Sequence, residues 1–409
     1  MKGIVLWFPL PLVVLFVASA CDNGKESQGG LGQPCYPDDT CDGPLVCEDG
    51  ECVAGGPYEK GDPVLLVEGG DAGGDGRWLL GVSADGDEPV EVGARFEWRP
   101  ATISGPAHDI DSAPAAHDGF GAFAVKKMYQ GQARLARGRI DDEPPQLVDL
   151  GDIEAVALHV AGDAVFVGAW GEVGWVDMKE SVPEYERLVH RPDMEHKPYD
   201  LFARDCDRLL AIDDIILPIL GDYFHLDERG KPTHLADWHL PGYQNGTYEH
   251  VLLVPDEGDD RVLYVAARFV SGYTGPGRVL SGHRVEGNSL GDDARQLREP
   301  LNDELIAGDE PTDFEGLAWY PGTESLEPAL LVAAGERGLI VLPDMIDSEE
   351  PAYIVDVGGP CLDVAFAAGR VHALVGGDAP RVVRLSYEDG EWSTGAHLAL
   401  DEPGSRFAR

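Results

Sequence analysis

The chain of 409 residues has 74 acidic residues against 31 lysines and arginines, a formal net charge of −43 at pH 7. This charge repels nucleic acid and anionic lipid head groups, so a nucleic-acid-binding function is excluded, while metal cations, basic proteins and neutral ligands stay open as partners. The 52 glycines and 30 prolines indicate many turns and 43% hydrophobic residues are enough for a large core, so we expect an all-β fold.

Residues 1–20 have the layout of a bacterial export signal. One basic residue, Lys2, precedes an apolar run that ends in small residues, and two prolines within it disfavour a membrane-spanning helix. The small residues before Cys21 resemble the lipobox of bacterial lipoproteins, in which the signal peptide is cut off before a cysteine that is then acylated. The resemblance implies lipidation of Cys21 and a place in the bacterial cell envelope, at the outer membrane or cell surface rather than the inner membrane.

Residues 21–34 are rich in glycine and polar side chains and have almost nothing apolar to bury. Such a composition is typical of a flexible linker. We expect it to connect the lipid anchor to the folded part of the protein.

Residues 35–53 form a cysteine-rich module with Cys35, Cys41, Cys47 and Cys52. So short a stretch cannot enclose a hydrophobic core and needs crosslinks. The even spacing favours disulfides over the paired cysteines of zinc sites, and three connectivities are open. The stretch resembles the C-x-x-G-x-C modules of secreted dickkopf-type proteins, which implies the pairs Cys35–Cys47 and Cys41–Cys52 and a role as a spacer or docking module.

Residues 58–409 contain a loose internal repeat of alternating strand, polar turn, apolar strand, turn and third strand. Repeats of about fifty residues are typical of the four-stranded blades of a β-propeller. We predict seven blades, or six if the faint second copy is an elaborate loop. The seven copies begin at Asp62, Asp118, Glu154, Asp200, Glu249, Glu315 and Asp363.

The copies that begin at Glu154 and Asp363 resemble the LVIVD repeat of bacterial and archaeal surface propellers. That resemblance implies a surface-exposed binding scaffold.

A carboxylate stands before the first strand of every copy. Since the first strand of a blade lines the central axis of a propeller, these carboxylates are predicted to ring one mouth of the channel. Two interpretations are open. The ring could bind a shared cation such as calcium, which prefers oxygen ligands, or each carboxylate could accept backbone N–H bonds within the structure. The seven residues are Asp62, Asp118, Glu154, Asp200, Glu249, Glu315 and Asp363.

Residues 313–342 resemble a blade of the β-propeller phytases and of gluconolactonase-type hydrolases. The resemblance implies that Glu315 and Glu336 hold calcium and activate water on a phosphate ester or lactone. The phosphate-binding cations of phytases have few counterparts, chiefly Lys126 and Lys127.

Two other features are interpreted as ordinary surface. His234 and His239 flank Asp237, and without a third ligand they are predicted to be solvated loop residues. The acidic stretches 71–76 and 256–260 are predicted to be turns.

Cys206 and Cys361 remain after the module's four cysteines and Cys21. The repeat places them at opposite ends of their strands, too far apart for a disulfide, so we predict two free thiols.

The sequence thus predicts a monomeric, lipid-anchored cell-envelope protein whose β-propeller binds or scaffolds a protein or glycan. The alternative is a calcium-dependent propeller hydrolase that uses Glu315 and Glu336.

Overall fold

The computed structural model describes part of the chain, and its regular elements are all β-strands. Among the described residues, no helix is long and apolar enough to cross a membrane. The predicted signal peptide, the predicted linker and the cysteines Cys21, Cys35 and Cys41 lie outside this part. The described residues are 45–48, 51–54, 64–69, 77–85, 88–98, 120–125, 134–139, 146–149, 155–161, 164–177, 184–191, 199–205, 207–213, 219–227, 230–240, 246–255, 260–269, 277–286, 289–290, 314–322, 328–343, 352–388 and 391–408.

The first two strands form a small antiparallel sheet of their own, β1 (Leu45–Glu48) with β2 (Glu51–Ala54). Cys47 lies directly opposite Cys52 in this pair. The two predicted disulfides involve Cys35 and Cys41, so they stay a prediction.

The remaining described strands form six four-stranded antiparallel sheets and one three-stranded sheet, each built mostly from strands that follow one another in the chain. The first three in chain order contain β3 (Val64–Gly69), β4 (Arg77–Ser83) and β5 (Glu91–Trp98); β6 (Phe120–Val125), β7 (Arg134–Arg139) and β8 (Gln146–Asp149); and β9 (Ala155–Ala161), β10 (Ala164–Ala169), β11 (Glu172–Asp177) and β12 (Tyr185–His190).

The other sheets follow the same order. They contain β13 (Tyr199–Asp205), β14 (Arg208–Asp213), β15 (Ile219–Leu226) and β16 (Pro232–Leu240); β17 (Gly246–Pro255), β18 (Arg261–Phe269), β19 (Gly277–Glu286) and β20 (Ser289–Leu290); β21 (Gly316–Tyr320), β22 (Ala329–Ala333), β23 (Leu339–Pro343) and β24 (Tyr353–Val355); and β25 (Cys361–Ala367), β26 (Arg370–Val375), β27 (Arg381–Glu388) and β28 (Glu391–Ala399). The last strand is β29 (Gly404–Ala408).

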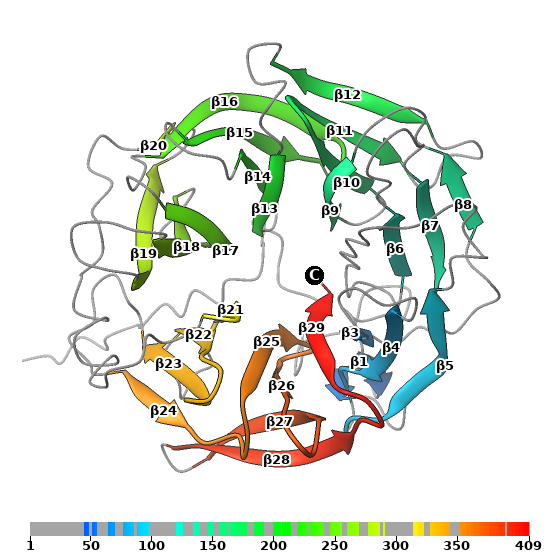
Figure 1. Cartoon of the computed structure of the whole chain (residues 1–409), viewed down its shortest axis with the longest axis vertical. Coiled ribbons are helices and arrows are strands. Elements are labelled where there is room, and N and C mark those ends of the chain that lie inside the picture. The colour runs from blue at the N-terminus through cyan, green and yellow to red at the C-terminus, as the bar shows by residue number, and fades with distance from the viewer. Residues whose placement is uncertain are drawn as a thin grey trace, which may run out of the picture.

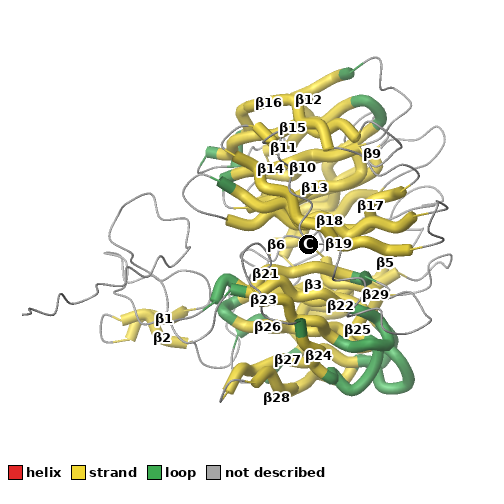
Figure 2. The backbone as a smooth tube through the Cα atoms, turned by 90° about the vertical axis from the view of Figure 1, so that its left-hand side faces the viewer, coloured by secondary structure: helices red, strands yellow, loops and turns green. Residues whose placement is uncertain are grey.

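The sheets stand around a common axis as the blades of a β-propeller (Figure 1). Strands β9, β13, β17, β21, β25 and β29 lie towards the centre, and each contacts the next around the ring. Figure 2 shows the ring from the side, with β1 and β2 set apart from it. The three-stranded sheet falls in the faint copy that begins at Asp118, where much of the chain lies outside the described residues, so the predicted number of blades stays a prediction.

The ring is closed by strands from the two ends of the propeller sequence. In the closing sheet, of order β29-β3-β4-β5, the C-terminal strand β29 is innermost and pairs with β3, with Phe407 opposite Val67. The expectation that the copy beginning at Asp62 starts with an innermost strand is therefore wrong, because β3 is second in its sheet. The carboxylates that precede the innermost strand here are Asp401 and Glu402.

Where the side chains are described, neighbouring sheets pack face to face, because alternate side chains of a strand point to opposite sides of its sheet. In β15, Phe224 packs with Phe166 against sheet β9–β12, whereas its neighbour Tyr223 packs with Leu263 against sheet β17–β20. The core is therefore a series of layers between neighbouring sheets, which explains the long apolar runs of the middle strands.

One end of the ring carries the connectors between sheets. At this end the chain leaves the outermost strand of one sheet and enters the innermost strand of the next. Because successive strands are antiparallel, the turn between the second and third strand of a sheet also lies at this end. These turns include β10–β11, β22–β23 and β26–β27. We call this end the connector face.

Candidate functional site

A polar group near the connector face joins strands β15 and β16. Asp222 and Asp237 are direct partners across the two strands, and His234 lies opposite Phe224. The pairing shifts between Tyr223 and Phe224, so β16 contains an extra residue at this point. Such a bulge moves His234 and Asp237, which strict alternation would place on opposite faces, onto the face that carries Asp222.

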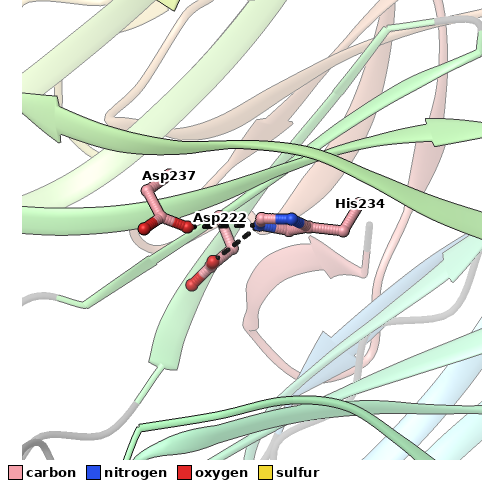
Figure 3. Close-up of side chains that lie close together, drawn as sticks. All are labelled: Asp222, His234 and Asp237. Atoms are coloured by element: carbon pink, nitrogen blue, oxygen red, sulfur yellow. Dashed lines mark hydrogen bonds and ion pairs between the residues drawn. The ribbon is translucent and has the colours of Figure 1, made fainter.

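The three side chains approach one another closely (Figure 3). His234 Nε2 lies 3.0 Å from Asp222 Oδ1 and 3.5 Å from Asp237 Oδ1. The Asp222 side chain is fully buried, whereas the side chains of His234 and Asp237 are 39% and 54% exposed. The group therefore extends from the junction between two sheets to the surface. The expectation that His234 lies in a loop is wrong, since it lies in strand β16 beside a buried carboxylate, whereas its exposed side chain agrees with the expectation of a solvated residue.

Arg191 bridges the two carboxylates of this group. Its Nη2 donates to Asp222 Oδ1 at 2.8 Å and lies 2.7 Å from Asp237 Oδ1, and its Nε donates to Asp222 Oδ2 at 3.3 Å. The hydrogen bonds to Asp222 raise the pKa of Arg191, so the guanidinium stays charged. Its backbone N–H donates to Gly171 O at 2.7 Å, which ties the connector after β12 to the β10–β11 turn.

Tyr199, the first residue of β13, is the last member of this polar group around Asp222. Its hydroxyl donates a short hydrogen bond to Asp222 Oδ2. Burial, followed by the charge of Asp222, raises the pKa of Tyr199, so the phenol keeps its proton and remains a donor. The backbone of β13 reaches this place because Gly168 has no side chain: a Cβ there would lie 2.0 Å from the carbonyl oxygen of Tyr199.

Asp222, His234 and Asp237 each offer one ligand atom within 4.8 Å of the others, and among the described residues they are the one such group of three. One nitrogen and two carboxylate oxygens suit a transition-metal ion. Arg191, however, already supplies a positive charge between the two carboxylates. A metal ion would have to displace it, so the arrangement is best explained as an ion-pair network that joins two sheets.

Other sheet junctions are braced by arginine as well. Arg261, at the start of β18, forms a short ion pair with Asp205 of β13. Arg384, in β27, donates to the carbonyl oxygen of Asp85 at 3.0 Å, beyond the end of β4. In this acidic protein, buried arginines therefore stabilise contacts between neighbouring sheets.

The predicted ring of carboxylates is described in part. Asp62, Asp118 and Glu154 lie outside the described residues, and of Asp200 only the backbone in β13 is described. Glu249, Glu315 and Asp363 lie in or just before β17, β21 and β25, at the end where these innermost strands begin. None of these three belongs to the group of possible metal ligands found among the described residues.

The Asp363 carboxylate accepts hydrogen bonds from backbone N–H groups, as in the second of the two interpretations of the carboxylate ring. Its side chain is buried, with Oδ1 accepting from the N–H of Val364 at 2.8 Å and Oδ2 from the N–H of Phe407 at 2.9 Å. The carboxylate therefore joins β25 to β29 across the junction between two sheets. The shared calcium site stays a hypothesis for the other positions.

Glu315 and Glu336, the hydrolase candidates, lie at the same end of one sheet. The N–H of Glu315 donates to Ala333 O at 2.8 Å, just before β21 begins, and Glu336 is exposed in the β22–β23 turn. Lys126 and Lys127, the candidate phosphate-binding residues, lie outside the described part of the chain.

The side chain of His239 also lies outside the described part. The same holds for the acidic stretches 71–76 and 256–260, apart from Asp260.

Cys361 is a free, buried thiol at the start of β25. Burial raises its pKa, and its Sγ donates to the carbonyl oxygen of Asp363 at 3.7 Å. This agrees with the prediction for Cys361, while Cys206 lies outside the described residues.

An open pocket of about 630 Å3 lies on the connector face, which we call the connector pocket. It is formed by the residues after β24, the β26–β27 turn, the facing ends of β27 and β28, and the connector before β29. Sequence reasoning missed it, because these segments are brought together by the fold. Its lining comprises Asp356, Val357, Gly358, Asp378, Ala379, Pro380, Arg381, Val383, Thr394, Gly395, His397, Ala399, Leu400 and Asp401.

The ring of sheets defines the protein as a β-propeller. No protein-family model matches the chain, and no curated protein is similar to it in sequence. A protein of known crystal structure from Lactobacillus plantarum has a TM-score of 0.50 and 14% identity over 84% of this chain and 98% of its own. At this identity the similarity concerns the fold alone.

Two further structures are similar at lower scores. Hsv2 of Kluyveromyces lactis has a TM-score of 0.46 and 11% identity, covering 83% of this chain and all of its own. The dihydro-heme d1 dehydrogenase NirN has a TM-score of 0.44 and 13% identity, covering 88% of this chain and 71% of its own.

Proposed function

We propose that the protein is a lipid-anchored binding protein of the bacterial cell envelope, which holds a protein or glycan partner at the connector face of its propeller. The observation that carries the proposal is the connector pocket, because it is a concave site with polar groups on a framework of sheets that pack face to face. Concave sites of this size with a few convergent polar groups are typical of binding sites. The anchor is Cys21, after removal of residues 1–20, with residues 21–34 as the tether.

The framework supports a binding role. The sheet junctions are held by apolar layers and by buried arginines, whereas the connector face is made of turns and connectors that carry exposed side chains. Rigid sheets that present variable loops are a common way to position binding residues.

The hydrolase hypothesis has less support. Glu315 and Glu336 lie at the same end of their sheet, but the described residues place no third metal ligand with them.

The binding proposal is tested with a photo-crosslinking amino acid placed in the lipoprotein in its native cells. Ala379 is an exposed residue of the connector pocket, and Glu391 is an exposed residue at the opposite end of the same sheet. We expect crosslinked products from position 379 and none from position 391. Equal products from both positions, or none from position 379, would contradict binding at the connector face.

The anchor is tested separately with Cys21→Ser. Without the acylated cysteine the protein should leave the membrane fraction, since the predicted anchor is a lipid. Retention of the variant in washed membranes would contradict the lipoprotein proposal.

A further inference from the structure

We infer that a small anion of the size of chloride binds between the Tyr223 hydroxyl and the Arg208 guanidinium, inside the junction of sheets β13–β16 and β17–β20. The site lies at the end of the ring opposite the connector face, so this inference is independent of the proposed function. It is carried by two buried donors without a partner, by the register of the strands that bear them and by the charges around them.

Tyr223 has a buried hydroxyl that forms no hydrogen bond with any residue that the structure describes. The residue is 2% exposed and packs with Leu210 and Leu263 in the apolar layer between the two sheets. A buried hydroxyl without a hydrogen bond costs free energy, so such a group is ordinarily bonded to protein, water or an ion. Burial raises the pKa of Tyr223, so the phenol keeps its proton and remains a donor.

The register of β14 and β15 places a second donor beside this hydroxyl. Leu210 lies opposite Tyr223, and Arg208 lies opposite His225. Since cross-strand partners and alternate residues share one side of a sheet, these side chains all lie on the face that packs against sheet β17–β20. Arg208 Nε is buried there, and within the described part of the chain it has no hydrogen-bond partner. Two neighbouring donors thus call for one acceptor.

The charges around the hydroxyl favour a negatively charged acceptor. Arg261 lies two residues before Leu263 in β18, so it belongs to the face of that sheet that is turned towards Tyr223. The positive charges of Arg208 and Arg261 act on the Tyr223 pKa more strongly than the negative charges of the neighbouring aspartates. The local field is therefore positive, although the chain as a whole has a net charge of −43.

The two aspartates of this junction are engaged by the arginines. Asp205 forms a short ion pair with Arg261. Asp207 Oδ2 lies 2.5 Å from Arg208 Nη1 and 3.1 Å from His225 Nδ1. These contacts hold the Arg208 guanidinium through Nη1, and its Nε remains available to a ligand.

The burial of the two donors restricts the size of the ligand. Tyr223 Oη and Arg208 Nε are both buried, whereas the side chains of Asp207 and His225 are 44% exposed. A single-atom anion passes these side chains when they move, but an organic anion would have to separate the packed layers of the two sheets. Chloride accepts hydrogen bonds from O–H and N–H donors alike, so it fits both groups.

The test measures unfolding of the full-length protein by urea, because guanidinium chloride would itself supply the anion. Sodium chloride replaces sodium gluconate at constant ionic strength, and tryptophan fluorescence reports the fraction unfolded. An anion that binds only the folded state stabilises it by mass action. We expect about 200 mM chloride to lower the unfolding equilibrium constant about tenfold relative to gluconate, as for a concentration about ten times the dissociation constant.

Variants locate the site. Tyr223→Phe removes the hydroxyl alone, so in gluconate it should be at least as stable as the wild type, since the lost group has no partner there. It should bind chloride about tenfold more weakly, because a hydrogen bond to a charged ligand is lost. Arg208→Lys keeps the charge but lacks the Nε–H group, and it should weaken chloride binding as well.

The matched control is Tyr264→Phe. It removes a hydroxyl from a fully buried tyrosine at the next junction, between sheets β17–β20 and β21–β24, and should leave the effect of chloride unchanged. Three outcomes would overturn the inference. No chloride effect in the wild type would assign the hydroxyl to a water molecule, a full effect in Tyr223→Phe would place the anion elsewhere, and an equal loss in Tyr264→Phe would show that the effect is not specific to this junction.

Discussion

Asp363 Oδ2 accepts a hydrogen bond of 2.9 Å from the backbone N–H of Phe407, which joins β25 to the strand that closes the ring. Both residues are almost fully buried. One side chain thus satisfies a backbone donor of the neighbouring sheet at the point of closure, where the last strand of the chain pairs with the first strand of the propeller.

Asp363→Ala should destabilise the protein by about 2 to 4 kcal/mol, because it leaves the buried N–H groups of Val364 and Phe407 without their acceptors. Asp363→Asn should cost less, since its amide oxygen can still accept one of the two bonds. Denaturant unfolding followed by tryptophan fluorescence measures both, with the exposed Asp378→Asn as the control. Unchanged stability of Asp363→Ala would show that closure does not depend on this carboxylate.

Arg191→Met should cost about 3 kcal/mol or more, because it keeps the aliphatic stem but leaves the buried carboxylate of Asp222 without its cation. In the double variant with Asp222→Asn, the loss should be smaller than the sum of the two single losses. A double-mutant cycle of unfolding free energies measures this coupling. Additive losses would contradict an ion-pair network at this junction.

The same cluster gives a prediction for metal ions. Zinc at submillimolar concentration should leave the melting temperature of the wild type unchanged, because Arg191 occupies the space between the carboxylates. A rise in melting temperature that is lost in His234→Gln would show that Asp222, His234 and Asp237 form a metal site.

Acid should destabilise the protein through two buried histidines. Burial lowers the pKa of His283 to about 4, and burial together with the charge of Arg384 lowers that of His372 to about 3. Both values lie below that of an unfolded histidine, about 6.5, so the unfolded chain binds protons first as the pH falls. Their contribution is complete above about pH 6.5 and is lost towards pH 4 to 3, by up to about 1.4 kcal/mol per pH unit and histidine.

His372→Leu and His283→Leu should each flatten the dependence of unfolding free energy on pH between 6.5 and 4. Asp205 acts in the opposite direction, since burial raises its pKa to about 6 and the folded state then holds its proton more tightly. The comparison is therefore made as a difference between each variant and the wild type. A difference that does not change with pH would contradict the buried neutral state of these histidines.

A shared calcium site is tested by mass action. If the carboxylates outside the described residues bind calcium in the folded state, a chelator lowers the melting temperature and added calcium restores it. No shift at millimolar calcium would assign all these carboxylates the hydrogen-bonding role seen at Asp363.

The repeat of alternating strands and polar turns was sufficient to predict a β-propeller, because strand periodicity and turn residues are local properties of the chain. The same repeat predicted a carboxylate near the beginning of each innermost strand. Asp363 lies near the beginning of β25, as this prediction requires. Only the tertiary structure decided three other features: the pairing of Phe407 with Val67, the bulge that brings His234 and Asp237 to Asp222, and the connector pocket. The first joins the two ends of the propeller sequence, the second is a one-residue shift of register, and the third needs several turns and strand ends of residues 356–401 to meet in space. Local periodicity contains none of this information.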